Sequence, residues 1–290
     1  MAVEDSEGPE GAVGGETAGE RFGAFTKRNI LLVSVFFLSN LLTAVSTLVT
    51  AVTVLRESRT DWHAAEYRKL SQLRAGYTLE KFQQELGPPV FRTALEGGGG
   101  PFVRNVYRPR EQYWVEVISD KNNAAMTYAV TTCDPAFRPE FFYGGARKGR
   151  VVLNENTLSD VLPPEEQREE SLKVYFGYTA GSPGVVFQVY DRGAASAYRQ
   201  FAWGLNEVCP TWHSKTPGYD PLVSWAGWYQ KHQGQKKPPA GHSFLAEELN
   251  EGARLIMAES VVNTYAESAV DKTLLTFYPK QIGVNRLVVQ

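Results

Sequence analysis

The stretch "YWVEVISDKNNAAMTYAVTTC", residues 113–133, decides the fold expected for this chain. Two runs rich in β-branched and aromatic residues flank the polar tetrapeptide "DKNN", which is typical of a hairpin connection. Side chains alternate between the two faces of a strand, so Tyr113, Val115 and Val117 share one face of the first run. That face is the predicted core face, and Glu116 belongs to the opposite one. The stretch therefore predicts an antiparallel sheet.

Two short helices are predicted before this hairpin. The segment "TDWHAAEYRKLSQLRAG" has apolar residues at near-helical spacing and ends at Gly76, which suits a left-handed turn. Thr78 then offers a second N-cap, and apolar residues recur from Leu79 at i, i+3 and i+7. Gly87 and the two prolines after it end this second helix. With the strand "PFVRNVYR" and the hairpin, the segment forms an expected ααβββ unit.

The rest of the chain also contains strand-like segments and a helical segment. Further strands are predicted at 150–154, 171–178, 184–191 and 197–206. The segment 244–266 is expected to be helical, and 273–279 and 284–290 are expected to close the sheet as a pair of strands. A second sheet half related to the first remains an open alternative.

The N-terminal part has a different composition. Residues 1–20 hold six acidic and no basic residues, so a disordered acidic tail is expected over 1–26. Residues 30–55 are 26 uncharged residues between basic flanks, which predicts a transmembrane helix over 27–56. Three basic residues precede this span within twenty positions and five follow it, which favours a cytoplasmic C-terminal domain.

The predicted fold class is thus α+β, with one N-terminal transmembrane helix and then short helices packed on antiparallel sheet. The expected parts are the tail at 1–26, the membrane span at 27–56, the ααβββ unit at 57–145 and a second β-rich half at 146–290. A single-pass protein of the cell membrane follows from these expectations, with the lipid bilayer as one partner.

Two resemblances accompany this interpretation. Residues 70–133, with "AGYTLEKF" and "LGPPVF", resemble the SmpA/OmlA (BamE-like) lipoprotein domains, which place two short helices before a three-stranded antiparallel sheet; the lipobox cysteine of those proteins is absent. Residues 30–290 resemble an uncharacterised family of bacterial single-pass membrane proteins in the basic-flanked span, "YFGYTAGSPGVVFQVY" and "VVNTYAES". This resemblance implies an architecture and no catalytic residues.

Composition and motifs exclude several functions. A net charge of −2 and a pI near 6.2 argue against a nucleic-acid binder. Phosphate-binding, dinucleotide-binding and nucleophile-elbow sequences are absent, and neither a cofactor nor a metal is expected. A carboxylate pair such as Asp191 with Glu207 is interpreted as solvated surface. Cys133 and Cys209 either form one bridge in an oxidising compartment or stay buried as thiols, and burial as thiols is favoured.

Two groups of residues are candidates for ligand binding. The segment "GGARKGR" carries Arg147, Lys148 and Arg150 among three glycines, so it could present cations and backbone N–H groups to a phosphate or an anionic headgroup. A solvated connection is the simpler interpretation of that segment. The second group, assigned to a loop-like contact surface, consists of Trp212, Trp225 and Trp228.

The function expected from the sequence is a membrane-tethered, non-catalytic binding or assembly domain, with a protein partner or self-association. One alternative is a membrane-anchored, hydrolase-like enzyme whose site is assembled from scattered residues. The other is a cytoplasmic-side sensor or effector subunit that binds an anionic partner.

Overall fold

The computed structural model describes Ser34 and residues 43–47, 62–95, 101–143, 149–161, 172–177, 185–191, 199–209, 219–232, 243–245, 249–269, 273–278 and 282–285. The chain divides into two compact units, residues 1–62 and 63–290. The sheet and the helices that cover it belong to the second unit.

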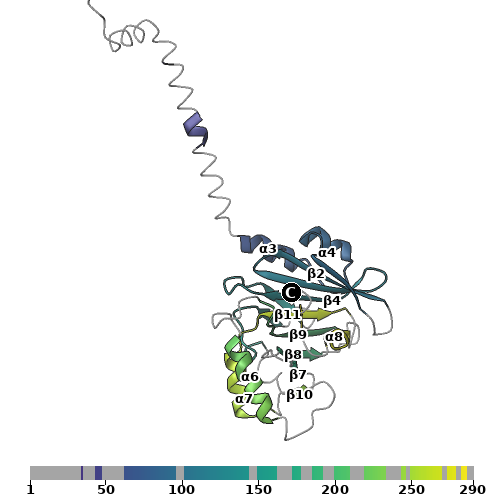
Figure 1. Cartoon of the computed structure of the whole chain (residues 1–290), viewed down its shortest axis with the longest axis vertical. Coiled ribbons are helices and arrows are strands. Elements are labelled where there is room, and N and C mark those ends of the chain that lie inside the picture. The colour runs from purple at the N-terminus through teal and green to yellow at the C-terminus, as the bar shows by residue number, and fades with distance from the viewer. Residues whose placement is uncertain are drawn as a thin grey trace, which may run out of the picture. The chain divides into compact units, whose positions relative to one another are not determined.

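One nine-stranded sheet forms the centre of the second unit, in the order β1-β2-β3-β4-β11-β9-β8-β7-β10 (Figure 1). Every pair of neighbouring strands is antiparallel, which confirms the predicted antiparallel sheet. The strands are β1 (Phe91–Leu95), β2 (Phe102–Arg110), β3 (Tyr113–Ser119), β4 (Ala125–Thr132), β7 (Leu172–Gly177), β8 (Val185–Asp191), β9 (Gln200–Leu205), β10 (Ser243–Leu245) and β11 (Thr264–Ser268). A separate hairpin consists of β5 (Glu140–Tyr143) and β6 (Gly149–Val152).

The upstream and downstream strands form one continuous sheet, because β11 lies between β4 and β9. Ala266 on β11 is opposite Ala129 on one side and Ala202 on the other. The two β-rich parts are therefore one sheet, and a relation between its upstream and downstream halves stays a prediction. The segment 244–266, which was expected to be helical, contains the helix α7 (Glu251–Glu259) and the first three residues of β11.

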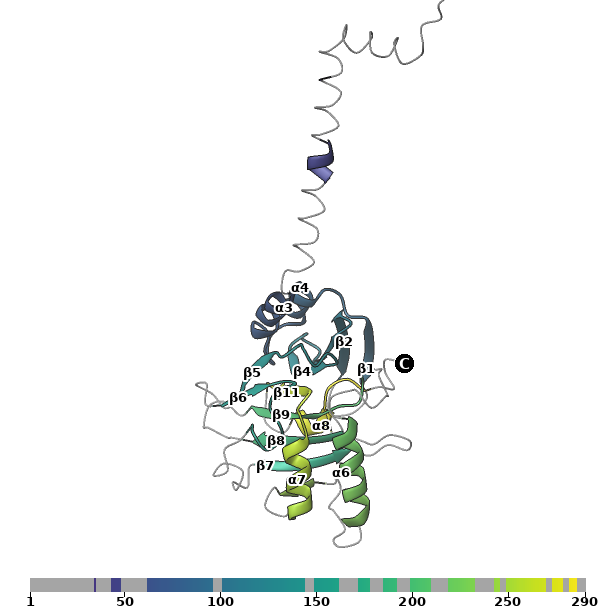
Figure 2. The same ribbon diagram turned by 90° about the vertical axis from the view of Figure 1, so that its left-hand side faces the viewer.

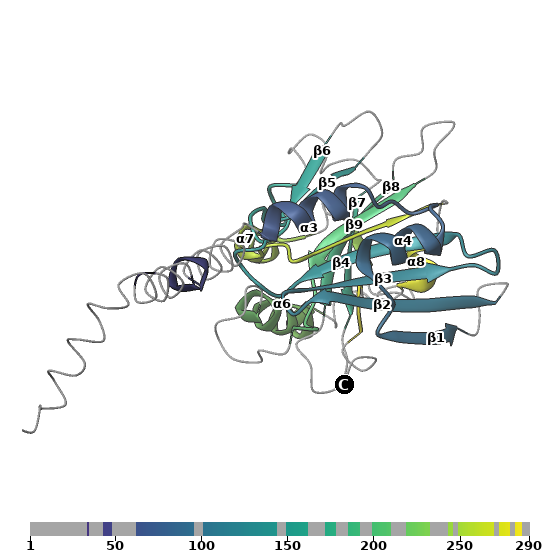
Figure 3. The ribbon, with the colours of Figure 1, turned by 90° about the horizontal axis from the view of Figure 1, so that it is seen from above.

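Helices α3 (Trp62–Ser71) and α4 (Leu79–Leu86) confirm the two helices predicted before the sheet (Figure 3). The apolar stripe of α4 is buried, and the ring of Phe82 lies 5.3 Å from that of Tyr128 on β4. Gly76 and Gly87 have φ of 93° and 82°, the left-handed backbone that the sequence predicted for them. We call the side of the sheet that carries Tyr128 the α4 face.

The opposite side of the sheet is also covered. There α8 (Thr273–Phe277) and residues 282–285 pack over a cluster that includes Ile118, Ala129 and Ala202. We call this side the α8 face. All seven residues of β3 are therefore buried, and the expectation that Glu116 lies on an outer face is wrong. The strand predicted at 273–279 is corrected as well, because a short helix occupies Thr273–Phe277.

A helical pair occupies the downstream half. α6 (Tyr219–His232) packs against α7 (Glu251–Glu259), and Figure 2 shows the two helices side by side. The region of α6 was interpreted as a loop from the sequence. Its Pro221 lies in the first turn of the helix, where no intrahelical N–H is required.

The transmembrane helix expected over 27–56 requires a correction. Most of that range lies outside the described residues, which there comprise Ser34 and 43–47. In the part of the chain that the structure describes, no helix is both long enough and apolar enough to cross a membrane. This finding corrects the fold class and the single-pass description based on that helix.

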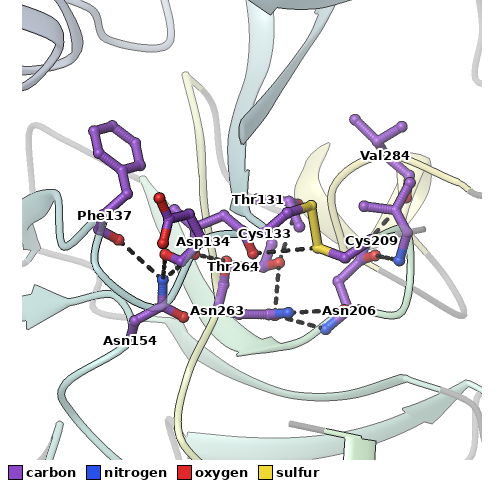
Figure 4. Close-up of a disulfide and its surroundings, with 12 residues drawn as sticks. Thr131, Cys133, Asp134, Phe137, Asn154, Asn206, Cys209, Asn263, Thr264 and Val284 are labelled. Atoms are coloured by element: carbon purple, nitrogen blue, oxygen red, sulfur yellow. Dashed lines mark hydrogen bonds between the residues drawn. A yellow bond between two sulfur atoms is a disulfide. The ribbon is translucent and has the colours of Figure 1, made fainter. Parts of the chain in front are cut away.

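A disulfide joins Cys133 to Cys209 (Figure 4). Cys133 follows the end of β4 and Cys209 lies beyond the end of β9, so the bridge links the two strands that flank β11. The expectation that the two cysteines stay as separate buried thiols is therefore wrong.

Candidate anion-binding pocket

A pocket of about 490 Å³ lies between α3, the loop after β4 and the β5–β6 hairpin. Figure 2 shows this hairpin beside α3. The wall of the pocket consists mainly of three arginines, two glutamates and two aromatic rings. The lining residues are Tyr67, Arg68, Ser71, Arg138, Glu140, Phe142, Arg150, Val152 and Glu155.

The helical wall is fixed by a buried carboxylate. Glu66 on α3 accepts hydrogen bonds from the Tyr113 hydroxyl (2.6 Å), Lys69 Nζ (3.0 Å) and Arg110 Nε (3.2 Å). Burial acts to raise the pKa of Glu66, but these hydrogen bonds outweigh it and hold the pKa below its ordinary value. Because Glu66 anchors α3 to the sheet, the next residue, Tyr67, is turned toward the pocket.

The loop after β4 forms the second wall. The backbone N–H of Arg138 donates to the Tyr67 hydroxyl at 2.7 Å, which links this loop to α3. The buried Phe137 ring stacks on the rings of Tyr67 and Tyr113, with centroids 5.1 and 4.9 Å apart. Asn154 Nδ2 donates to the carbonyl oxygen of Phe137 at 2.9 Å. These contacts fix the backbone from which the Arg138 side chain extends.

The β5–β6 hairpin forms the third wall. Side chains along β5 alternate strictly between a buried and an outward direction. Phe141 and Tyr143 of β5 are buried, so Glu140 and Phe142 point outward. Phe142 pairs with Arg150 across the hairpin, and these two side chains share the outward face. Gly149 is required beside Arg150, because a Cβ there would clash with the Tyr143 ring.

Two of the three arginines form only exposed ion pairs with glutamates. Arg150 lies 3.5 Å from Glu140 and Arg138 lies 3.6 Å from Glu155, and all four side chains are at least 40% exposed. Exposed pairs of this kind contribute about 0–1 kcal/mol, so an incoming anion can replace the glutamate at little cost. Arg68 makes no ion pair with any described residue. The described lining thus has three guanidinium groups against two carboxylates.

The structure brings only part of the expected site together. Arg150 lines the pocket, whereas Arg147, Lys148 and Trp212 lie outside the described residues. Arg68 and Arg138 were not identified from the sequence. They lie far apart along the chain and belong to no local motif, so only the fold reveals that they converge.

Trp225 and Trp228 lie on α6 and away from this pocket. Both rings are buried, with their centroids 5.8 Å apart. Trp225 Nε1 donates to Ser260 Oγ and Trp228 Nε1 to Asn250 Oδ1, each at 2.9 Å. These bonds join α6 to α7, so packing of the two helices explains the side chains. Ligand contact by them stays a prediction.

The backbone register also places the two residues of the carboxylate pair considered from the sequence. Asp191 lies opposite Gln200, whereas Glu207 follows the other end of β9. The backbone therefore puts these two residues toward opposite ends of this strand. Among the described residues no three His, Cys, Asp or Glu side chains lie close enough to hold a metal ion.

The fold and the pocket thus define an antiparallel α+β domain with an arginine-lined surface pocket. No family model, no curated protein and no solved structure matches the chain. The two resemblances drawn from the sequence stay predictions.

Proposed function

We propose that this protein is a non-catalytic binding domain that holds a carboxylate or phosphate group of its ligand in the arginine-lined pocket. One observation carries this proposal: Arg68, Arg138 and Arg150, from three separate elements, line the same pocket. The volume of about 490 Å³ lies within the range of small-molecule sites.

The chemistry of the wall indicates the ligand class. A guanidinium group binds a carboxylate or phosphate through two parallel N–H···O bonds, which gives directional recognition. The Tyr67 and Phe142 rings supply an apolar surface beside these cations. A ligand that carries an anionic group next to an aromatic or aliphatic group fits both features.

The same wall supports binding rather than catalysis. Glu140 and Glu155 are exposed and each faces an arginine, whereas a general acid or base is usually a carboxyl group shielded from water. The Ser71 hydroxyl donates to the carbonyl oxygen of Arg68 at 2.8 Å, as is typical of a hydroxyl at a helix end.

Phenyl phosphate and benzoate test the proposal, with benzyl alcohol as the neutral control. We expect calorimetric titration of the full chain to show binding of the anions and none of the alcohol, weakening with added salt. Replacing Arg68, Arg138 or Arg150 with Ala should weaken binding about tenfold each. Arg254→Ala, at an exposed position on α7, is the matched control and should leave the affinity unchanged. Equal binding of the alcohol, or equal losses in the Arg254 variant, would overturn the proposal.

A further inference from the structure

β1 forms one edge of the sheet and is unusually open. Among the described strands it pairs with β2 alone, and four of its five residues are exposed. Val90 and Phe91 keep 52% and 38% of their surface accessible. An edge strand also leaves half of its backbone N–H and C=O groups directed away from the sheet. This edge can therefore accept a further strand.

We propose that β1 pairs antiparallel with β1 of a second copy of this chain, about a two-fold axis at Thr93. In this register Phe91 lies opposite Leu95 of the second copy, and Arg92 lies opposite Ala94. The two nine-stranded sheets then continue across the axis. The surface is independent of the arginine-lined pocket, whose residues lie on α3, the loop after β4 and the β5–β6 hairpin.

Apolar contacts favour this register. β1 pairs with β2 so that Phe91 is opposite Val106 and Leu95 is opposite Phe102. Leu95 and Phe102 pack against the cluster of the α8 face, and the Phe102 ring lies 4.8 Å from the Phe277 ring. Phe91 of the second copy would meet Leu95 and extend this row. Its exposed ring would then be covered.

Charge favours the same register. With the axis at Thr93, the positive Arg92 faces the neutral Ala94 of the other copy. An axis at Arg92 would place two guanidinium groups directly opposite each other, which is unfavourable. The axis at Thr93 is also the one that uses all five residues of β1.

The other edge of the sheet supports a closed pair. β10 has only three residues, Ser243–Leu245, so it offers a shorter strand than β1 does. Pairing β1 with β10 of another copy would be heterologous and would form a ring of several copies or an open chain of molecules. Pairing β1 with itself is isologous and closes at two.

Cross-linking of the full chain tests the register directly. Both natural cysteines are joined in a disulfide, so an introduced cysteine supplies one free thiol. Thr93→Cys places two thiols opposite each other, within the Cα separation of about 4.4–6.8 Å that a disulfide needs. We expect it to form a disulfide-linked dimer under mild oxidation. Arg92→Cys is the matched control, because its thiol would face Ala94. Equal cross-linking of the two variants would contradict the register.

A charge variant tests the pairing without cross-links. Ala94 is exposed and lies opposite the neutral Val103 on β2, so Ala94→Lys leaves the single chain intact, but in the dimer each new ammonium group faces Arg92 of the other copy. Sedimentation of the wild-type chain should give twice the mass of one chain. The variant should dissociate at a concentration about tenfold higher or more. Gln84→Lys, exposed on α4, should stay dimeric. A wild-type chain that stays monomeric overturns the proposal, as does association that Ala94→Lys does not weaken.

Discussion

Asn206 and Asn263 exchange hydrogen bonds beside the disulfide (Figure 4). The backbone N–H of Asn206 donates to Asn263 Oδ1, and Asn263 Nδ2 donates to the Asn206 carbonyl oxygen, both at 2.8 Å. Asn206 Nδ2 also donates to the carbonyl oxygens of Ile282 and Val284, at 2.5 and 3.2 Å. This pair therefore joins the end of β9 to the start of β11 and holds the segment that covers the α8 face.

Replacing Asn206 with Ala should destabilise the fold by about 2–4 kcal/mol, because two buried carbonyl groups would lose their donor. Urea unfolding followed by tryptophan fluorescence measures the change. Gln84→Ala, at an exposed position on α4, should change the free energy of unfolding by less than about 0.5 kcal/mol. Similar effects of the two substitutions would contradict a structural role for the asparagine pair.

The disulfide between Cys133 and Cys209 should contribute roughly 4 kcal/mol, because it closes a long loop with a sequence separation of 76. Thiol titration of the folded chain should find no reactive cysteine until a reductant is added. Unfolding in the presence of reductant should then occur at lower denaturant concentration. The double variant with Ser at both positions should match the reduced wild type and should not respond to reductant.

Glu116 should make the fold less stable as pH rises. Burial raises its pKa from 4.5 to about 7, and Arg104, with Nε 3.2 Å from Oε2, opposes the shift only in part, as does the Tyr278 hydroxyl more weakly. The native state then holds a proton that the unfolded chain releases above its lower pKa. The stabilisation is complete below about pH 4.5 and is lost as pH rises to about 7, by roughly 3 kcal/mol.

Glu116→Gln cannot ionise and tests this linkage. Its free energy of unfolding, measured between about pH 5 and pH 8, should fall less steeply than that of the wild type. The variant should be the more stable of the two at the upper end of that range. Parallel curves for the two proteins would show that Glu116 does not cause the pH dependence.

Glu66 should act in the opposite direction, because its pKa lies below the ordinary value. Its stabilisation is present above the pKa of the unfolded chain and is lost as pH falls through the native pKa. Glu66→Gln should therefore cost about 2 kcal/mol at pH 7, where it breaks charged hydrogen bonds. The difference from wild type should shrink in acid. A difference that does not change with pH would mean that packing of the side chain, and not its charge, is what matters.

Local patterns in the sequence predicted the part of the fold that follows local rules. The helix that starts after Thr78 and ends at Gly87 formed as expected, and so did the hairpin around "DKNN". Thr78 holds the N-cap position, although its side chain makes no capping hydrogen bond. Both elements depend on turn residues and periodicity, which act over a few positions. The central strand β11 was missed because it lies buried on both faces and so shows no alternation. It even contains the buried Glu267, which accepts hydrogen bonds from the Ala75 N–H and the Tyr265 hydroxyl.

Local sequence patterns did not predict the pocket either, because its residues come together only in the fold. Arg150 was recognised because glycines and other cations surround it in the sequence. Arg68 and Arg138 are not set among glycines in this way, and they reach the pocket only because α3 and the loop after β4 lie beside the hairpin. The position of α3 on the sheet depends on the hydrogen bond between Glu66 and Tyr113, which lie 47 residues apart. No single segment of the sequence predicts long-range contacts of this kind.

Removing the pocket's own carboxylates should strengthen anion binding. Glu140 competes with a ligand for Arg150, and Glu155 competes for Arg138. Glu140→Gln keeps the size of the side chain and removes its charge, so the affinity for phenyl phosphate should rise about threefold to tenfold. Glu155→Gln should act in the same direction. Calorimetric titration measures both. Glu251→Gln, at an exposed position on α7, changes the net charge equally and should have no effect. Weaker binding after Glu140→Gln would mean that this carboxylate contacts the ligand as an acceptor, contrary to an anion site.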